Sequence, residues 1–203
     1  MSCATCGPMS PRSNQVRIIA GQWRGRKLSF PDAQGLRPTP DRVRETLFNW
    51  LAPLVTGSRC LDLFAGSGAL GFEAASRGAA HVVMVDHNPD IVRMLRRNQQ
   101  LLCADAIAIV QQEAEIYLAG RRSEQFDLVF LDPPFQDSSV LENSIRRLAG
   151  SGRLKADARI YLEMQAKSPE PSVPACWAVE KQKMAGQVAY RLYRQTGCDV
   201  KES

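Results

Sequence analysis

The spacing of apolar positions changes repeatedly along the chain after Arg59, and each change predicts a new element. Short, nearly continuous apolar runs are typical of buried strands, whereas apolar residues three and four positions apart predict helices. The predicted strands are 60–64, 82–85, 107–110, 126–131 and 159–162, and the predicted helices are 69–77, 88–102, 113–119 and 139–149. Because strand and helix alternate, we expect a doubly wound, mostly parallel α/β sheet.

A β-hairpin is expected near the start of the chain. Two strand-like pieces within residues 16–31 flank a glycine-containing turn. After a linker, Thr39 is expected to cap a helix that has Pro40 at its first position. Residues 1–15 are small, polar and dotted with proline, so they predict a disordered tail.

A second hairpin is expected at the other end of the chain. Residues 177–183 and 188–194 flank Ala185-Gly186, which is a typical turn sequence. This hairpin would complete a seven-stranded, mostly parallel sheet with one antiparallel strand. We therefore expect three parts: the tail, a β-hairpin extension with its linker at 16–38, and one α/β domain at 39–203.

Charge is distributed unevenly along the 203 residues. The formal net charge is only +5, so the placement of the charges is more informative than their sum. Between Arg12 and Glu45, eight basic residues accompany only three acidic ones, and Trp23 and Phe30 lie among them. This composition favours a surface for a polyanion such as nucleic acid, and an ordinary solvated segment is the alternative.

No targeting or membrane segment is expected. The first apolar stretch, 16–20, is too short for a signal peptide, and no apolar run approaches the length of a membrane span. Cys3 and Cys6 have no second pair of ligands to complete a zinc site, so no metal is expected. Cys60 and Cys103 lie in apolar-patterned stretches and are expected to be reduced core residues. The sequence thus predicts a cytoplasmic protein.

A glycine-rich segment predicts a cofactor site. Gly66-Ser67-Gly68-Ala69-Leu70-Gly71 has the G-x-G-x-x-G pattern between a predicted strand and a predicted helix, and Asp86 follows the next strand about 20 residues later. Glycines let a nucleotide approach the backbone, and a carboxylate at this spacing accepts hydrogen bonds from ribose hydroxyls. The pattern alone leaves a dinucleotide and S-adenosylmethionine open.

Asp62 favours S-adenosylmethionine. A carboxylate just before the glycine loop repels a pyrophosphate but attracts the ammonium and sulfonium groups of the methyl donor; a hydrogen bond to local backbone is the alternative. Phe64 is expected to line the cofactor cleft or to pack in the core, and Glu113 to contact adenine or to cap a helix. The expected cofactor contacts are Asp62, Phe64, Gly66, Ser67, Gly68, Gly71, Asp86, His87, Glu113 and Ala114.

The tetrapeptide Asp132-Pro133-Pro134-Phe135 directly follows the apolar run 126–131. A carboxylate and a backbone carbonyl held by rigid prolines can accept the two hydrogens of an amine, and an aromatic ring can stack on the base that carries it. These four residues are therefore the expected catalytic residues, with an exocyclic amine of a nucleobase as substrate. A strand followed by a proline-rich turn is the alternative.

Together these motifs are similar to those of class I S-adenosylmethionine-dependent methyltransferases that act on exocyclic amines. A more specific likeness to the RsmD family lies in four segments, RIIAG at 17–21, RGRKL at 24–28, RPTPDRVRE at 37–45 and GQVAY at 186–190. The resemblance implies a Rossmann-like methyltransferase fold with S-adenosylmethionine as cofactor. It also implies methylation of N2 of one guanine, guanine 966, in bacterial 16S ribosomal RNA, within the small ribosomal subunit or a late assembly intermediate.

Contacts to RNA phosphates are expected from the N-terminal part of the chain, and a monomer is expected. The residues expected to bind RNA are Arg17, Arg24, Arg26, Lys27, Arg37, Thr39, Arg42 and Arg44. Three alternatives stay open. An adenine-N6 methyltransferase would use the same tetrapeptide, a nicotinamide-dependent oxidoreductase would use the glycine pattern alone, and a non-catalytic RNA-binding assembly factor would use the basic segment alone.

Overall fold

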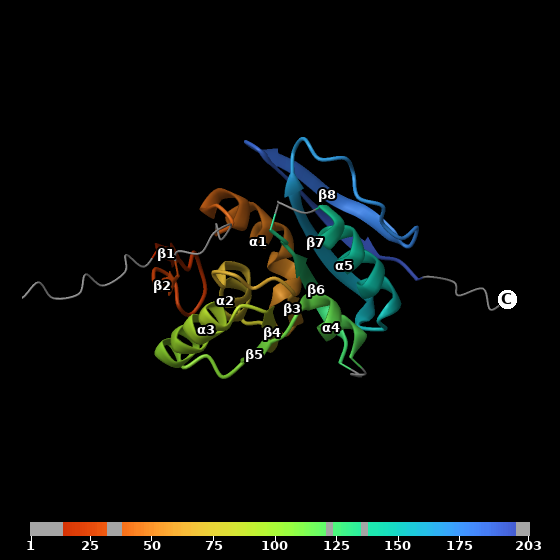
Figure 1. Ribbon diagram of the computed structural model, residues 1–203. Coiled ribbons are helices and arrows are strands. Elements are labelled where there is room, and N and C mark those ends of the chain that lie inside the picture. The colour runs from red at the N-terminus through yellow and green to blue at the C-terminus, as the bar shows by residue number, and fades with distance from the viewer. Residues whose placement is uncertain (1–13, 32–37, 121–123, 135–137, 198–203) are drawn as a thin grey trace, which may run out of the picture.

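One seven-stranded sheet organises the computed structural model, which describes residues 14–31, 38–120, 124–134 and 138–197 (Figure 1). The strand order is β5-β4-β3-β6-β7-β9-β8. Strands β3 to β7 pair in parallel, and β9 is antiparallel to both of its neighbours. The strands are β3 (Arg59–Asp62), β4 (His81–Asp86), β5 (Ile107–Gln111), β6 (Phe126–Leu131), β7 (Leu154–Gln165), β8 (Trp177–Ala185) and β9 (Val188–Gln195). The expected sheet with its C-terminal hairpin is confirmed.

Helices cover both faces of this sheet, as a doubly wound fold requires. Helices α1 (Asp41–Val55), α2 (Ala69–Ser76) and α3 (Pro89–Leu102) pack on one face and share a core that includes Phe48, Phe72 and Leu95. Helices α4 (Ala114–Ala119) and α5 (Ser138–Gly150) pack on the other face, where the core includes Tyr117 and Ile145. Among the described helices, none has both the length and the apolar content needed to cross a membrane.

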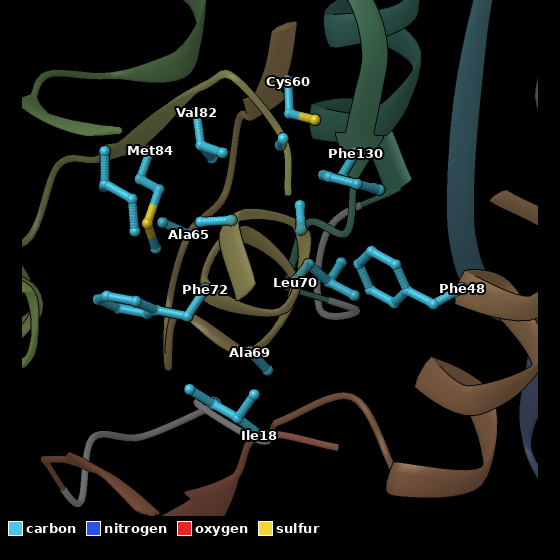
Figure 2. Close-up of a cluster of buried hydrophobic side chains, with 14 of the residues drawn as sticks. Ile18, Phe48, Cys60, Ala65, Ala69, Leu70, Phe72, Val82, Met84 and Phe130 are labelled. Atoms are coloured by element: carbon cyan, nitrogen blue, oxygen red, sulfur yellow. The ribbon is translucent and has the colours of Figure 1, made fainter. Parts of the chain in front are cut away.

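The expected N-terminal hairpin is present as β1 (Asn14–Arg17) and β2 (Lys27–Phe30), which pair antiparallel. It packs on the outside of α2 and α3, and Ile18 points toward Ala69 and Phe72 of α2 (Figure 2). Asn98 of α3 also donates a hydrogen bond of 2.8 Å to the backbone of β2. The hairpin therefore shares its core with the large domain.

Glu73 of α2 anchors the segment between the two strands of the hairpin. Its carboxylate is fully buried and accepts hydrogen bonds from the backbone N–H groups of Ile19 and Ala20 at 2.8 and 3.0 Å. Gly21 then passes so close to α2 that a Cβ atom there would lie 1.9 Å from the carbonyl oxygen of Ser76. This close approach, together with a φ of +82°, explains why glycine occupies the position.

Several local expectations were wrong. Pro40 rather than Thr39 occupies the N-cap position of α1, and no side chain caps that end. Cys103 is exposed at the end of α3 with a φ of +50°, so it is not a core residue. Phe30, which lies among the basic residues in the sequence, is buried in the core rather than part of a basic surface. Strand β7 begins five residues earlier than expected, at Leu154, and its pairing with β6 shifts register between Leu154 and Arg159.

Candidate active site

The carboxyl edge of the parallel sheet gathers the acidic residues singled out in the sequence. Asp86 ends β4, Asp62 ends β3 and Asp132 follows β6, and these three strands are direct neighbours in the sheet. Ligands of open α/β sheets bind outside this edge. The cofactor and amine motifs therefore belong to one site, although more than 40 residues separate them in sequence.

The glycine loop leads from β3 into α2 and has the backbone geometry that its sequence requires. Gly68 stands at the N-cap position of α2 with a φ of +79°, which is the left-handed region. A Cβ atom at Gly71 would lie 2.8 Å from the side chain of Met84, so this glycine allows the helix to pack closely on β4. Gly71 therefore acts through packing, whereas Gly66 and Gly68 shape the loop.

Asp62 lies buried beneath this loop, with an exposed fraction of 1%. Its Oδ2 accepts a hydrogen bond of 2.9 Å from the backbone N–H of Gly71, as the local-backbone interpretation predicted. Its Oδ1 is buried without a hydrogen-bond partner among the described residues. Burial, and then the nearby Asp132 charge, raise the pKa of Asp62 to about 7. A buried carboxylate oxygen with no donor fits a cationic ligand at this edge.

Asp86 joins the glycine loop to the end of β4. Its Oδ2 accepts from the N–H of Gly66 at 3.0 Å, and its Oδ1 accepts from the N–H of Asn88 at 2.9 Å. Burial raises the pKa of Asp86 despite these two hydrogen bonds. Each carboxylate oxygen can accept a second hydrogen bond, so both remain suited to ribose hydroxyls. The adjacent His87 is exposed and reaches Asp86 only at 4.0 Å.

The remaining expected cofactor contacts lie around the same edge. Ser67 is buried within the loop, and Phe64 is half-buried against the core on the α4 and α5 side. Glu113 stands at the N-cap position of α4 but makes no capping hydrogen bond through its side chain, which is exposed, while Ala114 is buried behind it. Glu113 follows β5, next to β4, so its position remains consistent with an adenine contact.

Asp132 is the half-buried carboxylate at the end of β6. Its Oδ2 accepts a hydrogen bond of 2.9 Å from the hydroxyl of Thr39. Burial raises the pKa of Asp132 to about 6, and the hydrogen bond from Thr39 partly opposes this shift. Pro133 is buried and Pro134 is exposed. Phe135 lies outside the described residues.

Glu163 was missed in the sequence and lies beside Asp132. The pairing of Leu131 with Leu162 between β6 and β7 brings the following residues of the two strands together. Glu163 is 3% exposed and accepts a hydrogen bond of 2.7 Å from the hydroxyl of Tyr161. Burial, and then the Asp132 charge, raise the pKa of Glu163 to about 8. An acidic residue in an otherwise apolar strand was the signal that could have revealed it.

The basic residues expected to bind RNA divide into two groups. Exposed side chains belong to Arg17, Arg24, Arg26, Lys27 and Arg42. Thr39 and Arg44 are buried, so the expectation that they hold phosphates was wrong. Arg44 donates to the backbone oxygens of Thr39 and Arg17 and to the carboxylate of Asp41, and lies 3.5 Å from Glu73. Arg37 and the Cys3 and Cys6 pair lie outside the described residues.

The fold and the site together define a Rossmann-like class I methyltransferase. A solved structure titled "Putative methyltransferase yhhF from Escherichia coli" is 45% identical and superimposes with a TM-score of 0.84, covering 91% of this chain and 100% of that one. Residues 16–194 match the family described as "Conserved hypothetical protein 95", and this chain belongs to that family. The predicted membership in the RsmD family is thereby confirmed.

Curated relatives cover almost the whole chain. A protein named "Ribosomal RNA small subunit methyltransferase D" from Escherichia coli (strain K12) is 48% identical over 188 residues, which are 93% of this chain and 94% of the relative. A protein of the same name from Haemophilus influenzae is 45% identical over 183 residues, which are 89% of this chain and 94% of the relative. The likeness therefore includes the N-terminal hairpin as well as the sheet.

Proposed function

We propose that this protein transfers a methyl group from S-adenosylmethionine to the exocyclic N2 amine of a guanine in the ribosomal RNA of the small subunit. The names of the curated relatives support the RNA and the reaction class. The choice of guanine N2 rests on the resemblance in the sequence. The observation that carries the proposal is Asp132, placed at the end of β6 beside the strand that leads into the glycine loop.

The charges at the carboxyl edge support a cationic methyl donor. Burial raises the pKa of Asp62, Asp132 and Glu163, and the charge of Asp132 raises the pKa of Asp62 and Glu163 further. When bound, S-adenosylmethionine supplies an electrophilic methyl group on a sulfonium centre. Asp62 would hold the cationic part of this cofactor, and Asp86 would hold its ribose. A pyrophosphate would instead be repelled by all of these carboxylates.

Asp132 and the backbone carbonyl of Pro133 would hold the amine of the base. An exocyclic amine is a weak nucleophile because its lone pair is delocalised into the ring. Two acceptors that take one hydrogen bond each from the amine favour a tetrahedral nitrogen, and the lone pair is then directed at the methyl carbon. Formation of the nitrogen–carbon bond would be matched by cleavage of the carbon–sulfur bond, which would leave the sulfur as a neutral thioether. The carboxylate of Asp132 can accept the proton that the amine then gives up. Positioning of this kind can supply up to about 7–11 kcal/mol of the barrier.

Methyl transfer to small subunits tests the proposal directly. Small subunits from a strain that lacks this enzyme would be incubated with the protein and labelled S-adenosylmethionine, and the modified nucleoside would be identified by mass spectrometry and mapped. We expect labelled N2-methylguanosine at a single position. N6-methyladenosine would favour the adenine-specific alternative, and binding without transfer would favour a non-catalytic assembly factor.

A further inference from the structure

Glu163 stands in a row of polar side chains that crosses the sheet beside the amine-binding motif. Leu131 pairs with Leu162, so Asp132 and Glu163 follow on neighbouring strands, and Glu163 itself pairs with Tyr190 of β9. Paired residues on adjacent strands point to the same face of a sheet. Glu163 therefore lies between Asp132 and Tyr190, and the segment GQVAY at 186–190 supplies one side of this row.

The carboxyl group of Glu163 is held in place by a hydrogen bond from its own strand. Tyr161 lies two residues earlier on the same strand, and its hydroxyl donates to Oε2 of Glu163 at 2.7 Å. Pro133, Pro134 and Glu163 line one small cleft, and the exposed Glu142 of α5 lines it as well. A buried side chain that is fixed by a hydrogen bond loses little further freedom when it contacts a ligand.

The amine-binding tetrapeptide cannot by itself distinguish guanine from adenine, because both bases carry an exocyclic amine. The ring nitrogen next to that amine differs between the two bases. In guanine, N1 carries a hydrogen and donates, whereas in adenine N1 has a lone pair and accepts. A carboxylate beside Asp132 can accept a hydrogen bond from N1–H of guanine but repels the N1 lone pair of adenine.

We propose that Glu163 selects guanine by accepting a hydrogen bond from the ring N1–H while Asp132 holds the neighbouring amine. This inference rests on the proposed function and names the residue that sets its base specificity. The carboxylate must be ionised to play this part. The titratable groups that face Glu163 are Asp132, Tyr161 and Tyr190, so burial and carboxylate repulsion oppose ionisation in the free protein. Binding of the cationic cofactor, and of a guanine whose N1–H donates, would favour ionisation of Glu163.

The test compares Glu163 with Glu142, a second glutamate among the residues that line this cleft. Glu163→Gln keeps the size of the side chain and an acceptor for Tyr161, and Glu142→Gln is the matched control. For each variant, kcat/KM is measured on small subunits with the natural target guanine and on subunits in which that guanine is replaced by adenine, between pH 6 and 9. Calorimetry with S-adenosylmethionine and thermal melting of each variant report on cofactor binding and folding.

We expect Glu163→Gln to lower kcat/KM on guanine by about 10- to 100-fold, which is the loss of one charge-assisted hydrogen bond. Cofactor affinity and melting temperature should not fall, and Glu142→Gln should behave as the wild-type protein. The increase of kcat/KM with pH that reflects Glu163 should be lost in the variant, and methylation of the adenine-substituted subunits should rise, because an amide can donate to N1.

Two results would overturn the inference. Wild-type kcat/KM and pH profile in Glu163→Gln would show that Glu163 does not contact the base. An equal loss of kcat/KM in Glu163→Gln and Glu142→Gln would show that any change among the residues of this cleft lowers activity, without a specific contact from Glu163 to the base. If the wild-type protein forms no N2-methylguanosine, the proposed function itself fails and the inference fails with it, which separates the two outcomes.

Discussion

The hydroxyl of Thr39 donates a hydrogen bond of 2.9 Å to Oδ2 of Asp132, across 93 residues of sequence. Thr39 precedes α1, and Asp132 directly follows β6. The hydrogen bond fixes one oxygen of the carboxylate and opposes the effect of burial on its pKa. Thr39, which the sequence suggested as a helix cap or a phosphate ligand, would therefore position the carboxylate that is proposed to bind the amine.

Thr39→Val should lower kcat more than it changes KM. The variant keeps the shape of the side chain but removes the hydrogen bond, so we expect a loss of about 10-fold in turnover. The pKa of Asp132 should rise further above its ordinary value, and the pH at which turnover is half-maximal should rise with it. Thr39→Ser, which keeps the hydroxyl, is the control. Equal turnover in both variants would contradict a positioning role.

Asp132→Asn should abolish methyl transfer while cofactor binding persists. The amide keeps the size of the side chain, but it neither attracts the amine hydrogens as strongly nor accepts a proton. We expect a loss of at least about 1000-fold in single-turnover rate, with a dissociation constant for S-adenosylmethionine within a few-fold of the wild-type value. Radiolabelled transfer and calorimetry measure the two quantities. Wild-type turnover in this variant would remove Asp132 from the proposed mechanism.

The buried carboxylates at the carboxyl edge predict a pH-dependent stability of the free protein. Folding raises the pKa of Asp132 to about 6 and that of Asp62 to about 7. A group with a raised folded-state pKa contributes stability that is fully present below its unfolded pKa and is lost as pH rises through the folded pKa. These contributions should therefore disappear between about pH 4 and pH 7. Compared with the wild-type protein, Asp132→Asn should melt at an increasingly higher temperature as pH rises from 5 to 8. A constant difference in melting temperature would contradict the assignment.

Gly21→Ala should destabilise the docking of the hairpin on α2. The new Cβ atom would overlap the carbonyl oxygen of Ser76 at 1.9 Å, in a backbone conformation with a φ of +82°. Gly25 has the same φ, and nothing lies within 4 Å of a Cβ atom there, so Gly25→Ala isolates the effect of φ. Thermal melting should show a loss of about 1 kcal/mol for Gly25→Ala and several kcal/mol for Gly21→Ala. Equal losses of stability in the two variants would mean that the contact between the new Cβ atom and Ser76 is relieved without a cost in free energy.

Charge reversal on the hairpin should weaken binding to the small subunit. Arg24→Glu combined with Lys27→Glu should raise the apparent KM for subunits. The slope of log affinity against log salt should become shallower by about 1 for each phosphate that the variant no longer binds. Lys181→Glu combined with Lys183→Glu changes the charge equally on the exposed strand β8 and is the control. An unchanged salt slope in the hairpin variant would place the RNA elsewhere.

Much of the fold could be predicted because buried strands have nearly continuous apolar runs, whereas helices have apolar residues three and four positions apart. The early part of β7 escaped prediction, since Lys155 and Asp157 interrupt its apolar pattern before Ala158. In the site, Asp62, Asp86 and Asp132 were identifiable because each ends or follows an apolar run. Their hydrogen-bond partners depend on strand order, which sequence spacing does not reveal.

The errors in the candidate site have a common physical cause. Arg44 and Thr39 were expected at the surface as phosphate contacts, yet both are buried with partners distant in sequence. Arg44 lies among Glu73, Asp41 and two backbone oxygens, so its charge stabilises the interior rather than a phosphate. Burial of such groups is decided by tertiary pairing, and no local pattern encodes it.

The carboxylate of Glu73 accepts hydrogen bonds from the backbone of the segment between β1 and β2. Helix α2, which carries Glu73, begins at the glycine loop. The N-terminal hairpin and the proposed binding site of the methyl donor are therefore both fixed to helix α2. Under the proposed function, this helix would fix the distance from the RNA bound by the hairpin to the point of methyl transfer. An RNA whose target base lies at a different distance from the hairpin-bound segment would then be a poor substrate, whatever its sequence.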